Sequence, residues 1–241
     1  MNPAIPDHPH ETTSARITRR ADALSRRLRA VGERVFPPTA QKSLRSFTSG
    51  EVAEIVGVSD GYLRQLSLDG LGPVPELGPS GRRSYTLVQV MDLRRYLATA
   101  RPKDAVRFWP RRREGDKLQV ITVANFKGGS AKTTTSLYLA QGLALSGLRV
   151  LAIDLDPQAS LSAMFGLQPE FDIAENATLY GAIRYDDQRV AMKDVVRPTY
   201  FTGISIVPGN LELMEFEHQT PRYMMEGRSR PDELFFRRVA R

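Results

Sequence analysis

The stretch LQVITVANFKGGSAKTTTS, residues 118–136, decides the fold. It opens at residues 118–126 with a short β-branched run that is typical of a buried strand. A glycine-containing loop, KGGSAKTT, follows at once over residues 127–134. We expect a helix over 135–146 and a second buried strand over 149–155. This order of strand, loop, helix and strand is the one that a phosphate-binding P-loop requires.

The loop residues have the chemistry that a nucleotide phosphate needs. Glycines let the backbone fold around phosphate with its N–H groups pointing inward, and the N-terminus of the following helix adds positive potential. Lys132 can reach the β- and γ-phosphates, and the Thr133 hydroxyl can ligate the Mg²⁺ that bridges them. We therefore expect ATP and Mg²⁺ as cofactors. The expected nucleotide-binding residues are Gly128, Gly129, Ser130, Ala131, Lys132, Thr133 and Thr134.

The loop departs from the common pattern G-x-x-x-x-G-K-[ST] at both glycines, where Phe126 and Ala131 stand. It matches instead K-G-G-x-x-K-[ST]-T, the deviant Walker A loop of the ParA/MinD group. The whole stretch 120–166 resembles ParA-type partition ATPases, and among them the RepA proteins encoded with plasmid replication genes. Many relatives have glycine in place of Ala131, so its methyl group could crowd the loop or change the rate of turnover.

The resemblance also implies roles for single residues. Lys132 would bind phosphate, Thr133 would ligate magnesium and Thr134 would contact phosphate. Lys127 would be the signature lysine, which reaches across a homodimer to the partner's nucleotide. The loop therefore supplies two of the expected catalytic residues, Lys127 and Lys132, and one expected metal ligand, Thr133.

Two carboxylates follow the second expected strand, in the motif I-D-L-D-P-Q over residues 153–158. The resemblance implies that Asp156 positions the attacking water, as the third catalytic residue, and that Asp154 supports the magnesium site. From the residues alone, two carboxylates that end a strand beside a P-loop can serve metal or water. The alternative is a strand-end turn that carries surface aspartates before Pro157.

A second motif, FTSGEVAEIVGVSDGYLRQLSL, spans residues 47–68 and is typical of a helix-turn-helix. Thr48 or Ser49 can cap a first helix, and Ser59 can cap a second one. Gly57 permits the sharp turn between them. The apolar residues that would face inward are Val52, Ile55, Val56, Leu63 and Leu66.

Polar residues around this motif are the candidate DNA contacts. The second helix leaves Tyr62, Arg64 and Gln65 for solvent or DNA, and the last two have donors suited to base edges. After a turn at residues 78–81, Arg82 and Arg83 lie on a strand that resembles the basic wing of MerR-type winged helices. The alternative is that these arginines are only solvated.

Charge is unevenly divided along the chain. Residues 1–113 hold 20 Lys and Arg against 11 Asp and Glu, a net charge of +9, whereas residues 114–241 hold 14 against 16, a net charge of −2. A basic first half favours a polyanionic partner for that half alone, although surface arginine would give the same numbers.

These motifs predict an α/β protein in which a mostly helical, winged helix-turn-helix domain precedes a P-loop NTPase with a parallel sheet. A disordered tail is expected over 1–13, the DNA-binding domain over 40–101, a linker over 102–117 and the ATPase domain over 118–241. The amphipathic helix expected over 14–36 would either pair two subunits or pack on its own domain. Its apolar residues are Ile17, Ala21, Leu24, Leu28, Val31 and Val35.

Composition excludes several classes of protein. The chain has no cysteine, so disulfides, thiolate zinc sites and thiol catalysis are excluded. The same absence excludes a nitrogenase iron protein, which needs cysteines for its cluster. No apolar run reaches the roughly 18 residues of a membrane span, and the first residues have no signal-peptide core. We expect a cytoplasmic, nucleoid-associated protein without a membrane partner.

The resemblance implies a plasmid partition (segregation) ATPase whose nucleotide-dependent homodimer acts with plasmid or nucleoid DNA. It also implies a ParB/RepB-like centromere-binding protein as a partner. The first domain would bind an operator and repress the protein's own operon. The alternative is a transcription regulator that uses the P-loop as a nucleotide sensor without useful hydrolysis. A MinD-like role is disfavoured by the helix-turn-helix and by the lack of a terminal amphipathic membrane helix.

The sheet is expected to be incomplete at its C-terminal side. After Asp156 no run of four or more β-branched residues closes on an aspartate, and the candidate strand Ile204–Pro208 runs into Gly209. Helices are expected over 179–183, from 210–217 and over 232–241, and the resemblance places the Walker B strand beyond them. We expect the N-terminal part of a protein of roughly 400 residues, with negligible hydrolysis by itself. The alternative is a natural short form that completes its sheet by dimerising.

Overall fold

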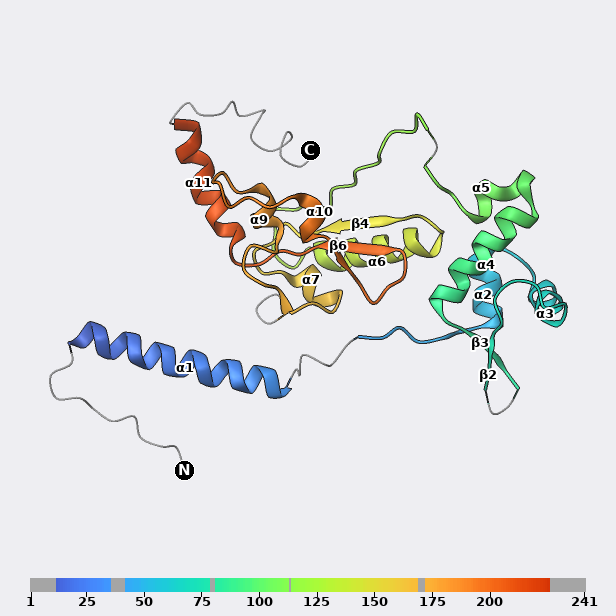
Figure 1. Cartoon of the computed structure of the whole chain (residues 1–241), viewed down its shortest axis with the longest axis horizontal. Coiled ribbons are helices and arrows are strands. Elements are labelled where there is room, and N and C mark those ends of the chain that lie inside the picture. The colour runs from blue at the N-terminus through green and yellow to red at the C-terminus, as the bar shows by residue number, and fades with distance from the viewer. Residues whose placement is uncertain (1–11, 36–41, 79–80, 113, 169–171, 226–241) are drawn as a thin grey trace. The chain divides into compact units, whose positions relative to one another are not determined.

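The computed structural model describes residues 12–35, 42–78, 81–112, 114–168 and 172–225 (Figure 1). The chain divides into two units, residues 1–41 and 42–241. Most of the expected tail, the middle of the turn at 78–81 and the expected helix at 232–241 lie outside the described residues.

The first unit holds one long helix, α1 (Thr13–Val35). Its apolar residues recur every three or four positions, which places them along one stripe, as the sequence predicts. The larger of them are 58–63% exposed: Ile17, Leu24, Leu28, Val31 and Val35. The stripe is therefore largely open to solvent.

The second unit begins with two short helices, α2 (Ser49–Val56) and α3 (Asp60–Leu68). Thr48 caps α2 in a capping box with Glu51, and the Ser59 hydroxyl accepts a hydrogen bond from the Tyr62 amide. Hydrogen bonds from Arg45 first, and then from Thr48, lower the pKa of Glu51 to about 2. Gly57 turns the chain at φ +79°, a region that favours glycine. The predicted starts of both helices and the turn between them are confirmed.

A small antiparallel sheet and a longer helix complete this part. The sheet has the order β1-β3-β2, with β1 Phe47–Thr48, β2 Glu76–Leu77 and β3 Arg83–Tyr85. Helix α4 (Leu87–Ala100) starts at a second capping box, made by Thr86 and Gln89. The core under these elements includes Val52, Leu63, Val90 and Leu97.

The first half of the expected linker is helical and packed. Residues Pro102–Asp104 form the 3₁₀ turn η1, and Ala105–Phe108 form α5, with the Phe108 side chain only 1% exposed. Arg94, 4% exposed, donates from Nη1 to the Phe108 carbonyl (3.0 Å) and from Nη2 to the Ile55 carbonyl (2.5 Å). Arg107 Nη2 donates to the Gly57 carbonyl at 2.7 Å. Two guanidinium groups therefore satisfy carbonyls at the C-terminal end of α2.

The rest of the unit is an α/β arrangement. Strands β4 (Val150–Ile153) and β6 (Ile204–Val207) pair in parallel, and β5 (Arg197–Pro198) pairs antiparallel with β6. Helix α6 (Lys132–Leu145) packs against β4 and β6 (Figure 1). The other helices are α7 (Ser160–Met164), α9 (Leu179–Ile183), α10 (Met192–Val195) and α11 (Leu213–Met225). The predicted helix at 179–183 and strand at 204–208 are confirmed.

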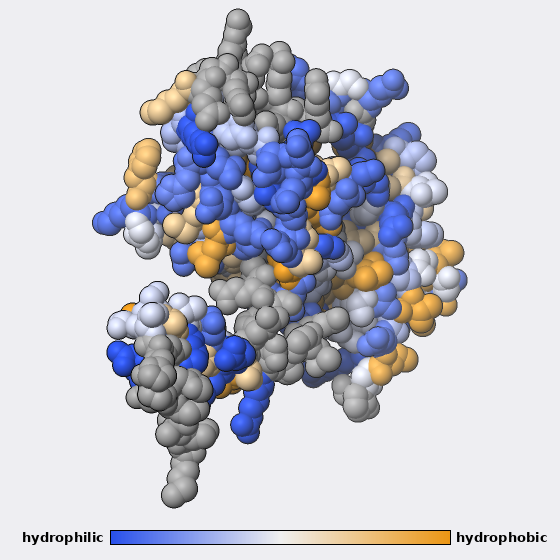
Figure 2. All heavy atoms as spheres, turned by 60° about the vertical axis from the view of Figure 1, so that its left-hand side comes forward, coloured by the Kyte–Doolittle hydropathy of each residue, from blue (hydrophilic) through white to orange (hydrophobic). Residues whose placement is uncertain are grey.

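One predicted strand is not formed. Residues 118–125 form neither a strand nor a helix, and Leu118, Val120 and Ile121 are 71%, 80% and 60% exposed. β-branched residues favour a strand only where a neighbour supplies ladder hydrogen bonds and covers the side chains. Among the described strands β4 is at the edge of its sheet, with β6 on one side. In the view of Figure 2, hydrophobic residues form small separate groups among hydrophilic ones.

Candidate functional site

The glycine-containing loop leads directly into α6. The helix begins at Lys132, three residues earlier than predicted, so Lys132, Thr133 and Thr134 form its first turn. The loop makes this sharp entry with two left-handed residues, Gly129 at φ +71° and Ala131 at φ +59°. The amides of a first helical turn have no intrahelical acceptor, so this turn can bind an anion.

Ala131 stores backbone strain at the start of α6. A left-handed conformation costs a residue with a Cβ about 1–2 kcal/mol, of which glycine's greater freedom in the unfolded state cancels about 0.4–1 kcal/mol. We expect Ala131→Gly to raise the free energy of unfolding by about 0.5–1 kcal/mol in urea titrations. Ala163→Gly, in the exposed part of helix α7, should lower it by about the same amount. Destabilisation by both changes would contradict this account of the loop.

The polar groups of the loop are arranged for an added acceptor. The Ser130 hydroxyl is buried and has no hydrogen-bond partner among the described residues, and a buried unpaired donor is costly. Within the described part of the chain, Lys132 Nζ makes one long hydrogen bond, 3.4 Å, to the Lys127 carbonyl. A Cβ added at Gly128 would meet no atom within 4 Å. The loop therefore fits a phosphate group, which would give Ser130 and Lys132 their partners.

The two carboxylates after β4 have different surroundings. Asp154 is 3% exposed; its Oδ2 accepts from the Ser162 amide (2.8 Å) and hydroxyl (2.7 Å), and its Oδ1 accepts from the Asp156 amide (3.2 Å). Asp156 is exposed, and its Oδ1 accepts from the Gln158 amide at 2.9 Å. Asp154 thus holds the turn together, whereas Asp156 presents a carboxylate to solvent.

This turn lies at the same end of the sheet as the loop. Helix α6 packs against β4 and connects to it through the four residues 146–149, so the two elements run in opposite directions. The N-terminus of α6, with Lys132, therefore lies near the C-terminal end of β4, where Asp156 follows. A ligand crevice at the carboxyl ends of parallel strands is the general arrangement in open α/β sheets.

Comparison with known proteins agrees with this geometry. A family model described as an AAA domain matches residues 118–235. "Putative replication protein A" of Rhizobium rhizogenes is 51% identical over 231 residues, which is 94% of this chain and 56% of that protein. A protein of the same name from Sinorhizobium fredii is 49% identical over 93% of this chain and 55% of its own length. Protein SopA of Escherichia coli K12 is 33% identical over 84% of this chain and 51% of SopA.

The chain is similar to proteins of the ParA family: a "ParA family protein" of Chlamydia trachomatis is 36% identical over 42% of this chain and 37% of its own length. The K-G-G-x-x-K-T-T loop and the I-D-L-D-P-Q turn of this chain lie within the region that the family model matches. The chain spans about half the length of the curated relatives it matches.

The predicted DNA contacts of this chain differ in how accessible they are. Arg64 and Arg82 are exposed, and Arg83 is half-buried on β3. Gln65 is exposed, but its Nε2 already donates to Asp69 at 2.7 Å. Tyr62 is half-buried, and the Arg101 guanidinium lies 4.4 Å from its ring centroid. Arg64 and Arg82 are therefore the side chains best placed to reach a ligand in solvent.

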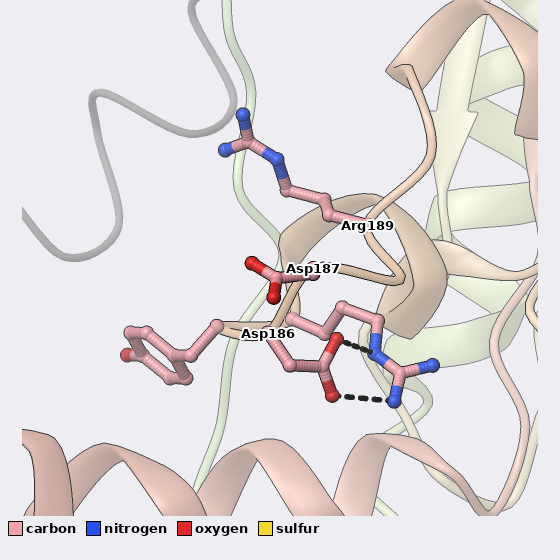
Figure 3. Close-up of a pocket in the computed structure, with 5 residues that line it drawn as sticks. Asp186, Asp187 and Arg189 are labelled. Carbon is pink, nitrogen blue, oxygen red and sulfur yellow. Dashed lines mark hydrogen bonds and ion pairs between the residues drawn. The ribbon is translucent and has the colours of Figure 1, made fainter.

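A surface pocket of about 390 Å³ lies elsewhere on the chain (Figure 3). It is lined by Arg184, Tyr185, Asp186, Asp187 and Arg189, none of which was predicted as a site residue. Arg184 forms an ion pair with Asp186 at 2.5 Å, and that contact lowers the pKa of the Asp186 carboxyl. Because its central charges already neutralise each other, the pocket is a weak candidate for a ligand site.

Neither a ready-made metal cluster nor a membrane-spanning helix is present among the described residues. In that part of the chain, no three His, Cys, Asp or Glu side chains lie close enough together to hold a metal ion by themselves. No helix there is both long enough and apolar enough to cross a membrane.

Proposed function

We propose that this chain acts in ATP-dependent plasmid partition and also represses its own operon as a DNA-binding protein. The observation that carries the proposal is the loop before α6, where the buried Ser130 hydroxyl has no hydrogen-bond partner among the described residues and Lys132 is the first residue of the helix. Similarity to the ParA family supports the same conclusion. The protein would act as a cytoplasmic, nucleoid-associated homodimer, with DNA and a ParB/RepB-like protein as partners.

The loop residues would hold ATP by direct contacts. Lys132 would bind the β- and γ-phosphates, Thr134 and the loop amides would donate to phosphate oxygens, and the Thr133 hydroxyl would ligate magnesium. Magnesium, when bound, neutralises charge on the phosphates. Lys127, which is exposed, would reach the nucleotide of the second subunit.

Asp156 and Asp154 would have different roles in hydrolysis. Asp156 would orient the attacking water, because it is the exposed carboxylate at the end of β4. Asp154 would support the magnesium site by fixing the turn, since its oxygens already accept three protein hydrogen bonds.

We propose that residues 40–101 are a winged helix-turn-helix domain that reads the operator. The capped helices α2 and α3, the turn at Gly57 and the antiparallel β-sheet support this assignment. Arg64 and Gln65, with Tyr62 beside them, would face base edges, and Arg82 and Arg83 would contact phosphates. The exposed apolar stripe of α1 supports pairing of two subunits through residues 14–36.

The rate of ATP hydrolysis distinguishes a partition ATPase from the alternative function, a transcription regulator that only senses nucleotide. We would measure phosphate release by this chain and by the Rhizobium rhizogenes relative, each alone, with DNA, and with DNA plus the ParB/RepB-like protein. The relative should show turnover stimulated by DNA and partner. This chain should remain below about one-tenth of that rate, because residues 118–125 before its loop have no strand beside them.

If both proteins bind ATP and neither shows stimulated turnover, the nucleotide-sensor function is the correct one. Stimulated turnover by this chain at the rate of the relative would show that the unpaired segment does not limit the site.

A further inference from the structure

The residue of interest is Ser162, the third residue of α7, whose side chain is completely buried. Its hydroxyl donates to Asp154 Oδ2 at 2.7 Å and accepts from the Gly209 amide at 3.1 Å. Its own amide donates to the same carboxylate oxygen at 2.8 Å. One side chain thus joins the turn after β4 to the turn after β6.

The two turns are fitted closely to each other. A Cβ added at Gly209 would lie 2.9 Å from the carbonyl oxygens of both Asp154 and Asp156, so only glycine fits there without a shift. The strands that precede the turns are in parallel register, with Ile153 opposite Val207. The backbone at Asp156 is therefore held from the Gly209 side as well as by its own strand.

We infer that Ser162 is a positioning residue for the nucleotide site, acting through Asp154 and the Gly209 amide to fix the Asp156 carboxylate. The inference rests on the proposed function, because it concerns how Asp156 is presented to a phosphate-bound magnesium ion and its water. A hydroxyl is needed at position 162 because that group must donate to a carboxylate and accept from an amide at once. Alanine can do neither.

The first test needs no nucleotide. Amide hydrogen exchange would be measured on the whole chain for wild type, Ser162→Ala and Ser160→Ala, a serine two residues earlier that is exposed. Ser162→Ala should speed exchange at Asp156 and Gly209 about tenfold, and Ser160→Ala should leave both rates unchanged. Unchanged rates in Ser162→Ala would overturn the inference. Gly209→Ala should speed amide exchange at Asp156 as well, because the added Cβ would press on the Asp154 and Asp156 carbonyls while the Ser162 hydroxyl is retained.

The second test asks whether Ser162 acts through Asp156. Affinity for ATP would be measured with and without Mg²⁺ in wild type, Ser162→Ala, Asp156→Asn and the double variant. Ser162→Ala should weaken the Mg²⁺-dependent binding about 10- to 100-fold, as loss of an outer support for a metal site does. It should have no further effect once Asp156 is replaced. Additive effects would show a merely structural role and overturn the inference. If wild type binds ATP no better than Lys132→Ala, it is the proposed function that fails, and the exchange rates still decide whether the hydroxyl joins the two turns.

Discussion

Replacement of Lys132 by alanine is expected to abolish measurable binding of ATP·Mg²⁺. Lys132 is the first residue of α6, and among the described residues its ammonium group makes one hydrogen bond, 3.4 Å long, to a loop carbonyl, so it is available to phosphate oxygens. A hydrogen bond to a charged group contributes about 1.5–3 kcal/mol. Loss of contacts to both the β- and γ-phosphates should weaken binding by about 100-fold or more. Isothermal calorimetry on the whole chain would measure it.

Lys193→Ala is the matched control for this experiment, because it removes an exposed lysine from α10. Its affinity for ATP should equal that of wild type. Equal affinities in wild type and Lys132→Ala would remove the assignment of the loop as a nucleotide site.

The second large effect is expected on DNA binding. Arg64→Ala should cost about 1–3 kcal/mol on the operator and relax the base preference, because an exposed arginine on α3 suits a base edge. Arg82→Ala and Arg83→Ala should weaken binding to all sequences alike and lower the salt slope by about 1 each. Fluorescence anisotropy at several salt concentrations, with specific and scrambled duplexes, would separate the two behaviours.

Arg189→Ala serves as the control here, since it removes one exposed arginine from the pocket that follows α9. It should change neither the affinity nor the base preference. The proposal that this chain represses an operon would be wrong if wild type bound no DNA even at low salt. Equal losses on both duplexes in Arg64→Ala would show that this arginine contacts phosphate instead of bases.

Local sequence signals predicted much of this structure. Thr48, Ser59 and Thr86 each precede a helix that they cap, and a cap needs only the few residues around it. Gly57 was likewise predictable, because a left-handed turn between two helices favours glycine wherever the rest of the chain lies.

The predictions that fail are those that depend on interactions between residues far apart in the sequence. The run at 118–126 has strand propensity, but a strand also needs a neighbour, and residue type alone does not supply one. Ser162 lies 47 positions before Gly209, and only the parallel pairing of β4 with β6 brings the two together. The basic, proline-containing segment 102–108 is predicted as part of a linker. In the structure Phe108 is buried, and Arg107 donates to the carbonyl of Gly57, which lies 50 positions earlier in the sequence.

Arg94 and Arg107, which donate to carbonyls at the end of α2, limit how such proteins can exchange domains by recombination. If the proposed DNA-binding unit were cut after residue 101, the Gly57 carbonyl would lose the Arg107 donor and the unit would lose Phe108 from its core. Arg94 would lose one of its two carbonyl acceptors by the same cut. The inherited piece must therefore run at least to residue 108. If this unit sets operator specificity, as proposed, recombination that exchanges that specificity between relatives should cross over after α5 and before the loop at residue 127.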